Sequence, residues 1–324
     1  MKMDDSFSGK TVLVTGGVGV IGSRLVRHLV QRHCNVVVLD DLSSASPWNL
    51  DGVDCRFING SVEDNGTLDL AFNHKPHLVF HLAALFANQN SVEHPERDLI
   101  VNGMGTLRLL THAADQGVDR VVYSSSSCVY GEEAVPHREP GASLHPKTPY
   151  QATKLLGEMY ASFFHSMRAL PVVNARLFNV YGPGELPGKY RNVIPHYIVN
   201  ALGGFPLEVH GSGDQTRDFT YVDDIVTGLC LCAEKPAAIG QTLNLGSGKE
   251  VSIRTVAEAI IELTGSRSEI VSSPFRSWDR VQRRCADLTL SKRLLGFDPR
   301  WDLRSGLQET VAWIKNSKEH WVRR

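Results

Sequence analysis

The 324-residue sequence has no excess of charge of either sign, with 34 lysine and arginine residues against 35 aspartate and glutamate residues. Proteins that bind nucleic acid or an anionic membrane usually carry a basic excess, so we expect neither partner. Long apolar runs are also missing, and no stretch approaches the roughly 20 apolar residues that span a bilayer. Residues 1–10 are polar and lack the apolar core of a signal peptide, which predicts a cytoplasmic location.

Cysteine is scarce and is not spaced for metal binding. The six cysteines form no C-x-x-C pair and no zinc spacing with the histidines. We therefore expect reduced thiols and no bound metal. Hydrophobic residues make up 42% of the chain, which is ordinary for a soluble protein with a proper core.

What the sequence does contain, in its first half, is an alternation of short β-branched runs with segments of helical spacing. The candidate helices include Ile21–Gln31 and Thr106–Gln116, and the candidate strands are Thr11–Thr15, Asn35–Leu39, Cys55–Ile58, Leu78–His81, Arg120–Tyr123 and Val172–Arg176. Continuous apolar strands separated by helices indicate a parallel sheet covered on both faces. We therefore predict an α/β fold with a Rossmann-type doubly wound sheet in residues 1–179. Residues 180–324 should form mainly a smaller α/β lobe, with some segments returning to the first domain.

A glycine-rich turn follows the first candidate strand. It satisfies both G-x-x-G-x-x-G and G-x-G-x-x-G, and a helix begins near its end. Glycine is needed where the turn is tight, where the backbone approaches a pyrophosphate, and where the helix packs on the strand. The positive end of that helix then points at the phosphates. The sequence predicts a dinucleotide site that includes Gly16, Gly19, Val20, Ile21 and Gly22.

The second candidate strand leads to Asp40, where a carboxylate would hold the adenosine ribose hydroxyls. The same carboxylate would repel a 2′-phosphate. The segment Asp41-Leu42-Ser43-Ser44 contains no arginine that could bind a 2′-phosphate. We therefore predict NAD rather than NADP, with Asp41 and Ser43 as further cofactor contacts.

Tyr150 and Lys154 form the pattern Y-x-x-x-K within a helical stretch, which places them on one helix face. A neighbouring ammonium should lower the pKa of the tyrosine from its usual value near 10. Tyr150 could then take a hydroxyl proton while hydride leaves the same carbon. A buried tyrosine beside a solvated lysine would give the same pattern. However, hydroxyls at Ser124–Ser127 mark the end of a candidate strand, where open α/β sheets place their sites.

Six motifs occur in order along nearly the whole chain. They are T-G-G-x-G-x-I-G-S, H-L-A-A (His81–Ala84), S-S-S-x-V-Y-G, Y-x-x-x-K, R-L-F-N-V-Y-G-P-G (Arg176–Gly184) and R-D-F-T-Y-V-D-D (Arg217–Asp224). Together they resemble the extended short-chain dehydrogenases that act on nucleotide sugars, above all the UDP-glucose 4-epimerase group. The resemblance implies bound NAD, a UDP-sugar substrate and a homodimer formed through helices that include residues 94–116 and 149–167.

The resemblance also assigns roles to individual residues. Ser126 would hydrogen-bond the reacting sugar oxygen, Tyr150 would be the base, and Lys154 would also hold the nicotinamide ribose. Further cofactor contacts would be Ser61 and Val62 near adenine, Leu82, Ala83 and Ala84 along the cofactor channel, and Ser124. Asn102 would buttress the centre of the sheet, although an ordinary capping asparagine fits this position equally well.

The second lobe would bind the nucleotide diphosphate of the substrate. In addition to the catalytic residues, the implied contacts are Phe86 and Ser127 at the sugar, Asn179, Arg217 and Arg276 at the phosphates, Asn192 and Val193 along the nucleotide, and Asp279 at its ribose. Arginine suits a diphosphate because its donors form a fork.

Ser127 and Cys128, which follow Ser126, limit the set of reactions that the site could catalyse. Sugar 4,6-dehydratases of this family carry acidic residues there to eliminate water, and this chain has no carboxylate at either position. This favours reversible C4 epimerisation of a UDP-hexose or UDP-hexuronic acid through a transient 4-keto intermediate. Dehydration, decarboxylation or net reduction on the same scaffold stays an alternative, and so does a non-catalytic NAD-binding regulator. The hexose is not identified, and Lys189, Arg191 or Ser127 could supply a donor near C6 of a uronate.

Overall fold

The computed structural model describes residues 6–275 and 281–321. Within these ranges, seven parallel strands form one sheet in the order β11-β6-β5-β4-β1-β2-β3. The strands are β1 (Thr11–Thr15), β2 (Asn35–Asp40), β3 (Arg56–Asn59), β4 (Leu78–His81), β5 (Arg120–Ser126), β6 (Val172–Leu177) and β11 (Thr242–Leu245). This order and the flanking helices confirm the predicted Rossmann-type fold.

Strand β5 is longer than the apolar pattern predicted. It was expected to end at Tyr123, but it continues through Ser124–Ser126 because these residues pair with Ala175–Leu177 of β6. Every residue of β5 and β6 is buried. The serine hydroxyls are therefore held at fixed places on the carboxyl end of a central strand.

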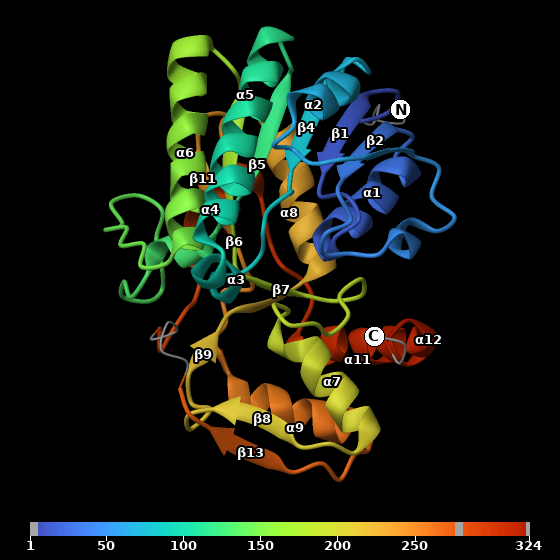
Figure 1. The fold of residues 1–324 in the computed structure, drawn as a ribbon. Coiled ribbons are helices and arrows are strands. Elements are labelled where there is room, and N and C mark those ends of the chain that lie inside the picture. The colour runs from blue at the N-terminus through green and yellow to red at the C-terminus, as the bar shows by residue number, and fades with distance from the viewer. Residues whose placement is uncertain (1–5, 276–280, 322–324) are drawn as a thin grey trace.

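Helices cover both faces of the sheet, as Figure 1 shows. One face packs against α1 (Val20–Gln31) and α8 (Val222–Glu234), and the other against α2 (Asn65–Phe72), α5 (Gly105–Asp115) and α6 (Pro149–Arg168). The remaining pieces of this half are η1 (Pro47–Leu50), α3 (Asn88–Glu93), α4 (Pro95–Asp98), η2 (Leu99–Met104) and η3 (Ser127–Tyr130). Because both faces are covered, the central strands read as continuous apolar runs rather than as alternating ones.

A smaller group of elements lies below the sheet in Figure 1. Its strands pair two by two: β7 (Asn179–Tyr181) with β10 (Phe219–Tyr221), β8 (Leu207–His210) with β13 (Ile270–Ser273), and β9 (Thr216–Arg217) with β12 (Val251–Ser252). The helical elements after β7, apart from α8, are α7 (Val193–Gly203), η4 (Pro236–Ala238), α9 (Ile253–Thr264), α10 (Thr289–Leu295), α11 (Leu303–Asn316) and α12 (Lys318–Trp321). The segments after residue 180 that pack with the large sheet include α8, β11 and α10. The domain boundary placed at residue 179 stays a prediction.

None of the helices in the described ranges combines the length and the apolar character that crossing a membrane requires.

Candidate active site

A cavity of about 640 Å³ opens at the carboxyl ends of the parallel strands and extends between the sheet and the smaller lobe. Most of the predicted site residues line it, although they come from distant parts of the chain. These residues are Gly16, Gly19, Val20, Ile21, Gly22, Asp40, Asp41, Ser43, Ser61, Val62, Leu82, Ala83, Ala84, Phe86, Ser124, Ser126, Ser127, Tyr150, Lys154, Asn179, Asn192, Val193 and Arg217. Arg276 and Asp279 lie outside the described residues, so the predictions made for them stay predictions.

The glycines in the turn after β1 are needed for two different reasons. Two of them leave no room for a side chain within the protein, and one leaves space in the cavity. A Cβ on Gly16, whose φ is +69°, would lie 2.6 Å from the Ala83 nitrogen, and a Cβ on Gly22 would lie 2.1 Å from the Gly16 oxygen. Packing therefore requires both glycines. A Cβ on Gly19 would meet protein atoms only at 3.4 Å, so its absence instead leaves room in the cavity.

Helix α1 begins directly after Gly19, with no side chain capping its first turn and no acidic residue in it. The first backbone amides of a helix have no acceptor within the helix itself. Together with the helix dipole, they form a binding place for an anion such as a pyrophosphate.

Asp40, at the end of β2, is held by the loops on either side of it. Its Oδ2 accepts a hydrogen bond from the Val18 amide and its Oδ1 from the Leu42 amide, each at 2.9 Å. Burial raises the pKa of this carboxyl, and the two amide hydrogen bonds oppose that shift. Each oxygen keeps a further lone pair for ligand hydroxyls.

Ser61, next along the cavity, has a buried Oγ with no hydrogen-bond partner among the residues that the structure describes. Buried polar atoms are rarely left without a partner, so an orphan on a cavity wall points to a ligand that supplies one. The glycine cradle, the helix start, Asp40 and Ser61 together fit a dinucleotide.

The catalytic candidates meet where β5 and α6 approach each other. Thr148 caps α6 by accepting a hydrogen bond from the Gln151 amide at 3.4 Å, and Pro149 occupies the first turn. This start places Tyr150 in the first turn of the helix, with its side chain close to Ser126. Lys154, one turn later, donates to the Ser124 carbonyl oxygen at 2.9 Å. Y-x-x-x-K therefore lies on a helix, as predicted.

The predicted lowering of the Tyr150 pKa is wrong for the protein alone. Burial raises the pKa of Tyr150 well above 10, and the neighbouring Ser126 hydroxyl only partly opposes this rise. Burial also lowers the pKa of Lys154 to about 8. Helical spacing indicated that the two groups are neighbours, but it gave no sign that both are buried. A positive charge bound in the cavity beside Tyr150 would oppose this rise in its pKa.

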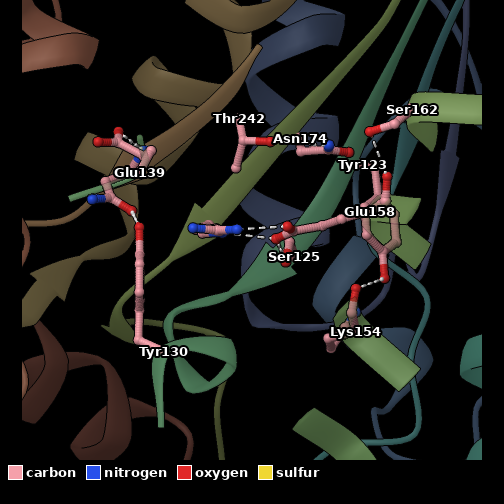
Figure 2. Close-up of polar contacts among 11 residues, drawn as sticks. Tyr123, Ser125, Tyr130, Glu139, Lys154, Glu158, Ser162, Asn174 and Thr242 are labelled. Carbon is pink, nitrogen blue, oxygen red and sulfur yellow. Dashed lines mark hydrogen bonds and ion pairs between the residues drawn. The ribbon is translucent and has the colours of Figure 1, made fainter. Parts of the chain in front are cut away.

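A buried ion pair lies one helical turn away from the candidate catalytic residue Lys154. Glu158 of α6 accepts hydrogen bonds from the Arg176 Nε at 2.8 Å and Nη2 at 2.7 Å. Figure 2 shows Ser125 of β5 beside the same carboxylate and, one turn away, the Lys154 carbonyl accepting a hydrogen bond from Tyr123. The helix that carries Tyr150 is therefore fixed to both strands.

Asn102 is not among the residues that line the cavity, so its place among the cofactor contacts stays a prediction. Its Oδ1 accepts from the Leu85 amide at 2.7 Å, and its Nδ2 donates to the buried Asp98 at 2.8 Å. Asp98 also accepts from Thr153 of α6 at 2.6 Å. Asn102 therefore positions the loop after β4, which carries the cavity residues Leu82–Phe86. This is closer to the buttressing role that was also considered for it.

On the substrate side, Phe86 meets the Tyr150 ring edge-on, with centroids 6.1 Å apart. Asn192 lies at the start of α7, and its Nδ2 donates to the buried Glu185 at 3.1 Å. Arg217 comes from β9 in the smaller lobe and is 7% exposed. Phe86 thus lines the cavity from the loop after β4, whereas Asn192 and Arg217 line it from the smaller lobe.

Among the cavity residues that sequence reasoning missed are Glu185 and Arg284. Arg284 follows another arginine, and nothing in the local sequence separates the two. Only the fold does so, because Arg283 forms an exposed ion pair with Glu250 while Arg284 is buried in the cavity wall.

The site can now be compared with known proteins. Residues 12–246 match the model of the NAD dependent epimerase/dehydratase family. The chain is 34% identical to a UDP-glucose 4-epimerase of Mycolicibacterium smegmatis, over 95% of this chain and 99% of that protein. It is 35% identical to a UDP-N-acetyl-alpha-D-glucosaminuronate decarboxylase of Bacillus cytotoxicus, over 94% and 98% of the two chains.

Solved structures give the same result. An epimerase from Methanothermobacter thermautotrophicus superposes with a TM-score of 0.96 at 46% identity, covering 97% of this chain and 95% of that one. A UDP-glucose 4-epimerase from Thermus thermophilus in complex with NAD superposes with a TM-score of 0.89 at 30% identity, covering 95% and 99%.

Proposed function

Since the chain belongs to the NAD-dependent epimerase/dehydratase family of the extended short-chain dehydrogenases, we propose that it catalyses reversible C4 epimerisation of a UDP-hexose or UDP-hexuronic acid. One observation carries the proposal. Ser126, Tyr150 and Lys154 meet at one end of a cavity, and no carboxylate follows Ser126 at Ser127 or Cys128.

The cofactor of this family is NAD, and the cavity offers a place for each of its parts. The start of α1 would hold the pyrophosphate, Asp40 the adenosine ribose, and Ser61 and Val62 the adenine. Ser124 and Lys154 would hold the nicotinamide ribose. When bound, NAD supplies a reversible acceptor for hydride and a positive charge beside Tyr150.

The side chains would then perform the proton chemistry. Ser126 holds the C4 oxygen of the sugar while Tyr150 takes the proton of the C4 hydroxyl. The hydrogen on the same carbon leaves as hydride, so a 4-keto sugar remains. After the sugar turns over, hydride returns to the opposite face of C4, and Tyr150 gives its proton back to the oxygen. Both the hydride and the proton have then returned to the sugar, so the cycle consumes no NAD.

Because the sugar must turn over within the cavity, the substrate has to be held by its nucleotide diphosphate instead. Asn179, Asn192, Val193 and Arg217 line the part of the cavity contributed by the smaller lobe and would hold the nucleotide diphosphate. Arg276 and Asp279 are proposed as further contacts from the sequence alone.

Dehydration, one of the other activities of the family, needs an acid that this catalytic end lacks. In the described part of the chain, the carboxylates that line the cavity are Asp40, Asp41, Glu185 and Glu208. The first two follow β2, Glu185 accepts hydrogen bonds from Asn192, and Glu208 lies on β8. None comes from the segment next to Ser126, where water elimination would need an acid.

The test is incubation with a panel of UDP-hexoses and UDP-hexuronic acids in deuterated water without added NAD. An inverted C4 at unchanged mass would support epimerisation. Deuterium at C5 with loss of water would identify a dehydratase, loss of carbon dioxide a decarboxylase, and stoichiometric NADH release a dehydrogenase.

We also propose a homodimer formed through α6 and the segment before α5. Met159, Phe163 and Met167 lie four residues apart on α6 and are 63%, 50% and 71% exposed. Leu99 and Met104 of η2, which packs against α6, are 53% and 44% exposed. Large apolar side chains gathered on adjoining elements indicate a surface that a partner covers.

A further inference from the structure

Arg284 places a buried guanidinium in the wall of the cavity. The residue is 6% exposed, and its Nη1 contacts the Cys128 Sγ at 3.4 Å. Its Nε is buried without a hydrogen-bond partner, and Arg284 forms no ion pair within the described ranges.

The protein does not neutralise this charge nearby. Glu250 pairs with Arg283 instead, with the Arg283 Nε at 3.0 Å from its Oε1. His137, close to Arg284, is held neutral, because burial and then the charge of Arg284 lower its pKa to about 4. A buried cation without a counter-ion is costly, since desolvation is not offset by attraction to a partner. The arrangement therefore suits an anion supplied by the ligand.

The position of Arg284 indicates which anion this is. Cys128 lies two residues after Ser126, and it also contacts the Asn88 Nδ2 at 3.6 Å. Asn88 in turn accepts a hydrogen bond from Thr148, the cap of the helix that carries Tyr150. Arg284 therefore lies at the catalytic end of the cavity.

In a hexopyranose, C1 and C4 lie on opposite sides of the ring. A diphosphate on C1 points away from the group that reacts at C4, and it cannot reach Arg284 while C4 lies against Tyr150. The substituent on C5, next to C4, is C6. C3, the other neighbour of C4, carries only a hydroxyl in the hexoses and hexuronic acids of the proposed function, so within these substrates a negative charge at Arg284 belongs on C6.

We propose that Arg284 binds a C6 carboxylate, and that UDP-hexuronic acids are the preferred substrates. The proposal rests on the proposed function, because it takes C4 as the carbon that faces Tyr150. A guanidinium holds a carboxylate through charge-assisted hydrogen bonds, and its free Nε provides a donor for one. The Ser127 hydroxyl lines the same cavity and can contribute a further donor. Lys189, considered from the sequence, is instead paired with Glu93 at 2.7 Å and is 65% exposed.

The experiment measures equilibrium binding, so its outcome does not depend on turnover. NAD-loaded wild type, Arg284→Gln and the matched control Arg283→Gln are titrated calorimetrically with UDP-glucuronate and with UDP-glucose. Retained NAD and an unchanged Tm show that the variants are folded. We expect the wild type to bind UDP-glucuronate at least about tenfold more tightly than UDP-glucose. Arg284→Gln should weaken UDP-glucuronate binding about 10- to 100-fold and change UDP-glucose binding little, as expected for losing hydrogen bonds to a charged group. The control should behave as the wild type.

Equal affinity of the wild type for both sugars, or equal weakening of both by Arg284→Gln, would overturn the inference. If Arg284→Gln does not fold, the inference is judged on the ratio of the wild type's affinities for UDP-glucuronate and UDP-glucose. The two proposals can fail separately. A preference for the uronate without formation of a C4 epimer would refute epimerisation only. Interconversion of UDP-glucose and UDP-galactose without any preference for the uronate would refute the role of Arg284 only.

Discussion

Glu158 and Arg176 form a bidentate ion pair whose side chains are 7% and 5% exposed, one helical turn beyond Lys154 on α6. The pair joins α6 to β6, and Ser125 adds β5 by donating to the same carboxylate. Removing one partner would leave the other charge buried and uncompensated.

We expect Arg176→Met to lower the free energy of unfolding by about 3–5 kcal/mol, because a carboxylate would be left buried without its counter-ion. Urea unfolding followed by circular dichroism measures this. Arg304→Met, which breaks an exposed ion pair with Glu262, is the control and should have little effect. Equal destabilisation by the two substitutions would contradict the importance assigned to burial.

Tyr150→Phe should leave the fold and NAD binding intact and lower kcat by about 10²-fold or more, because it removes the proton acceptor. The measurement is the initial rate on the best substrate of the panel, with bound NAD quantified in the same sample. A variant with nearly wild-type turnover would rule out Tyr150 as the base.

His81 predicts how stability depends on pH. It is buried between Thr15 and Thr106, with ring nitrogens 2.8 and 3.0 Å from their hydroxyls, and burial lowers its pKa to about 3. Between pH 6.5 and about 3 the unfolded chain binds a proton that the folded protein does not. This contribution to stability is therefore complete above pH 6.5 and is lost as the pH falls, by up to about 1.4 kcal/mol per pH unit. Urea unfolding from pH 7 to pH 4 should show a shallower pH dependence for His81→Asn than for wild type or for the exposed control His33→Asn.

Asp40→Ala should weaken NAD binding and reduce discrimination against NADP, because the carboxylate would no longer contact the ribose or repel a 2′-phosphate. Asp40→Asn separates the two effects, since it removes the charge and keeps the size. Fluorescence titration with both cofactors measures the ratio. Tighter binding of NADP than of NAD by the wild type would refute the role given to Asp40.

The proposed dimer predicts that Phe163→Lys yields monomers, because burying an ammonium in an apolar interface is unfavourable. Light scattering coupled to size exclusion measures the mass. Leu70→Lys on α2 is the control, since Leu70 is 58% exposed but lies outside the proposed surface. A monomeric wild type, or a dimer that tolerates the change at Phe163, would refute this interface.

The sequence predicted those parts of the site that depend on residues close together in the chain. The turn at Gly16–Gly22, the carboxylate at Asp40 and the spacing of Tyr150 and Lys154 each have a signature within a few residues. The sign of the Tyr150 pKa shift could not be found in this way, because it depends on burial by elements far apart in the chain. The position of Asn102 in the pattern likewise gave no sign that it bonds Asp98 and Leu85.

The last strand of the sheet has a consequence for biosynthesis. β11 pairs with β6, and Asn244 within it accepts a hydrogen bond from Tyr130 at 2.8 Å. A ribosome makes the chain from its N-terminus at roughly 5–20 residues per second. Strand β6 ends at Leu177, so it is complete about 65 residues before its final neighbour β11 begins at Thr242. Until then the edge of β6 is unpaired and able to join a strand of another nascent chain. A fragment ending at residue 179 would keep that edge permanently, and we expect it to aggregate rather than to bind NAD as a separate unit.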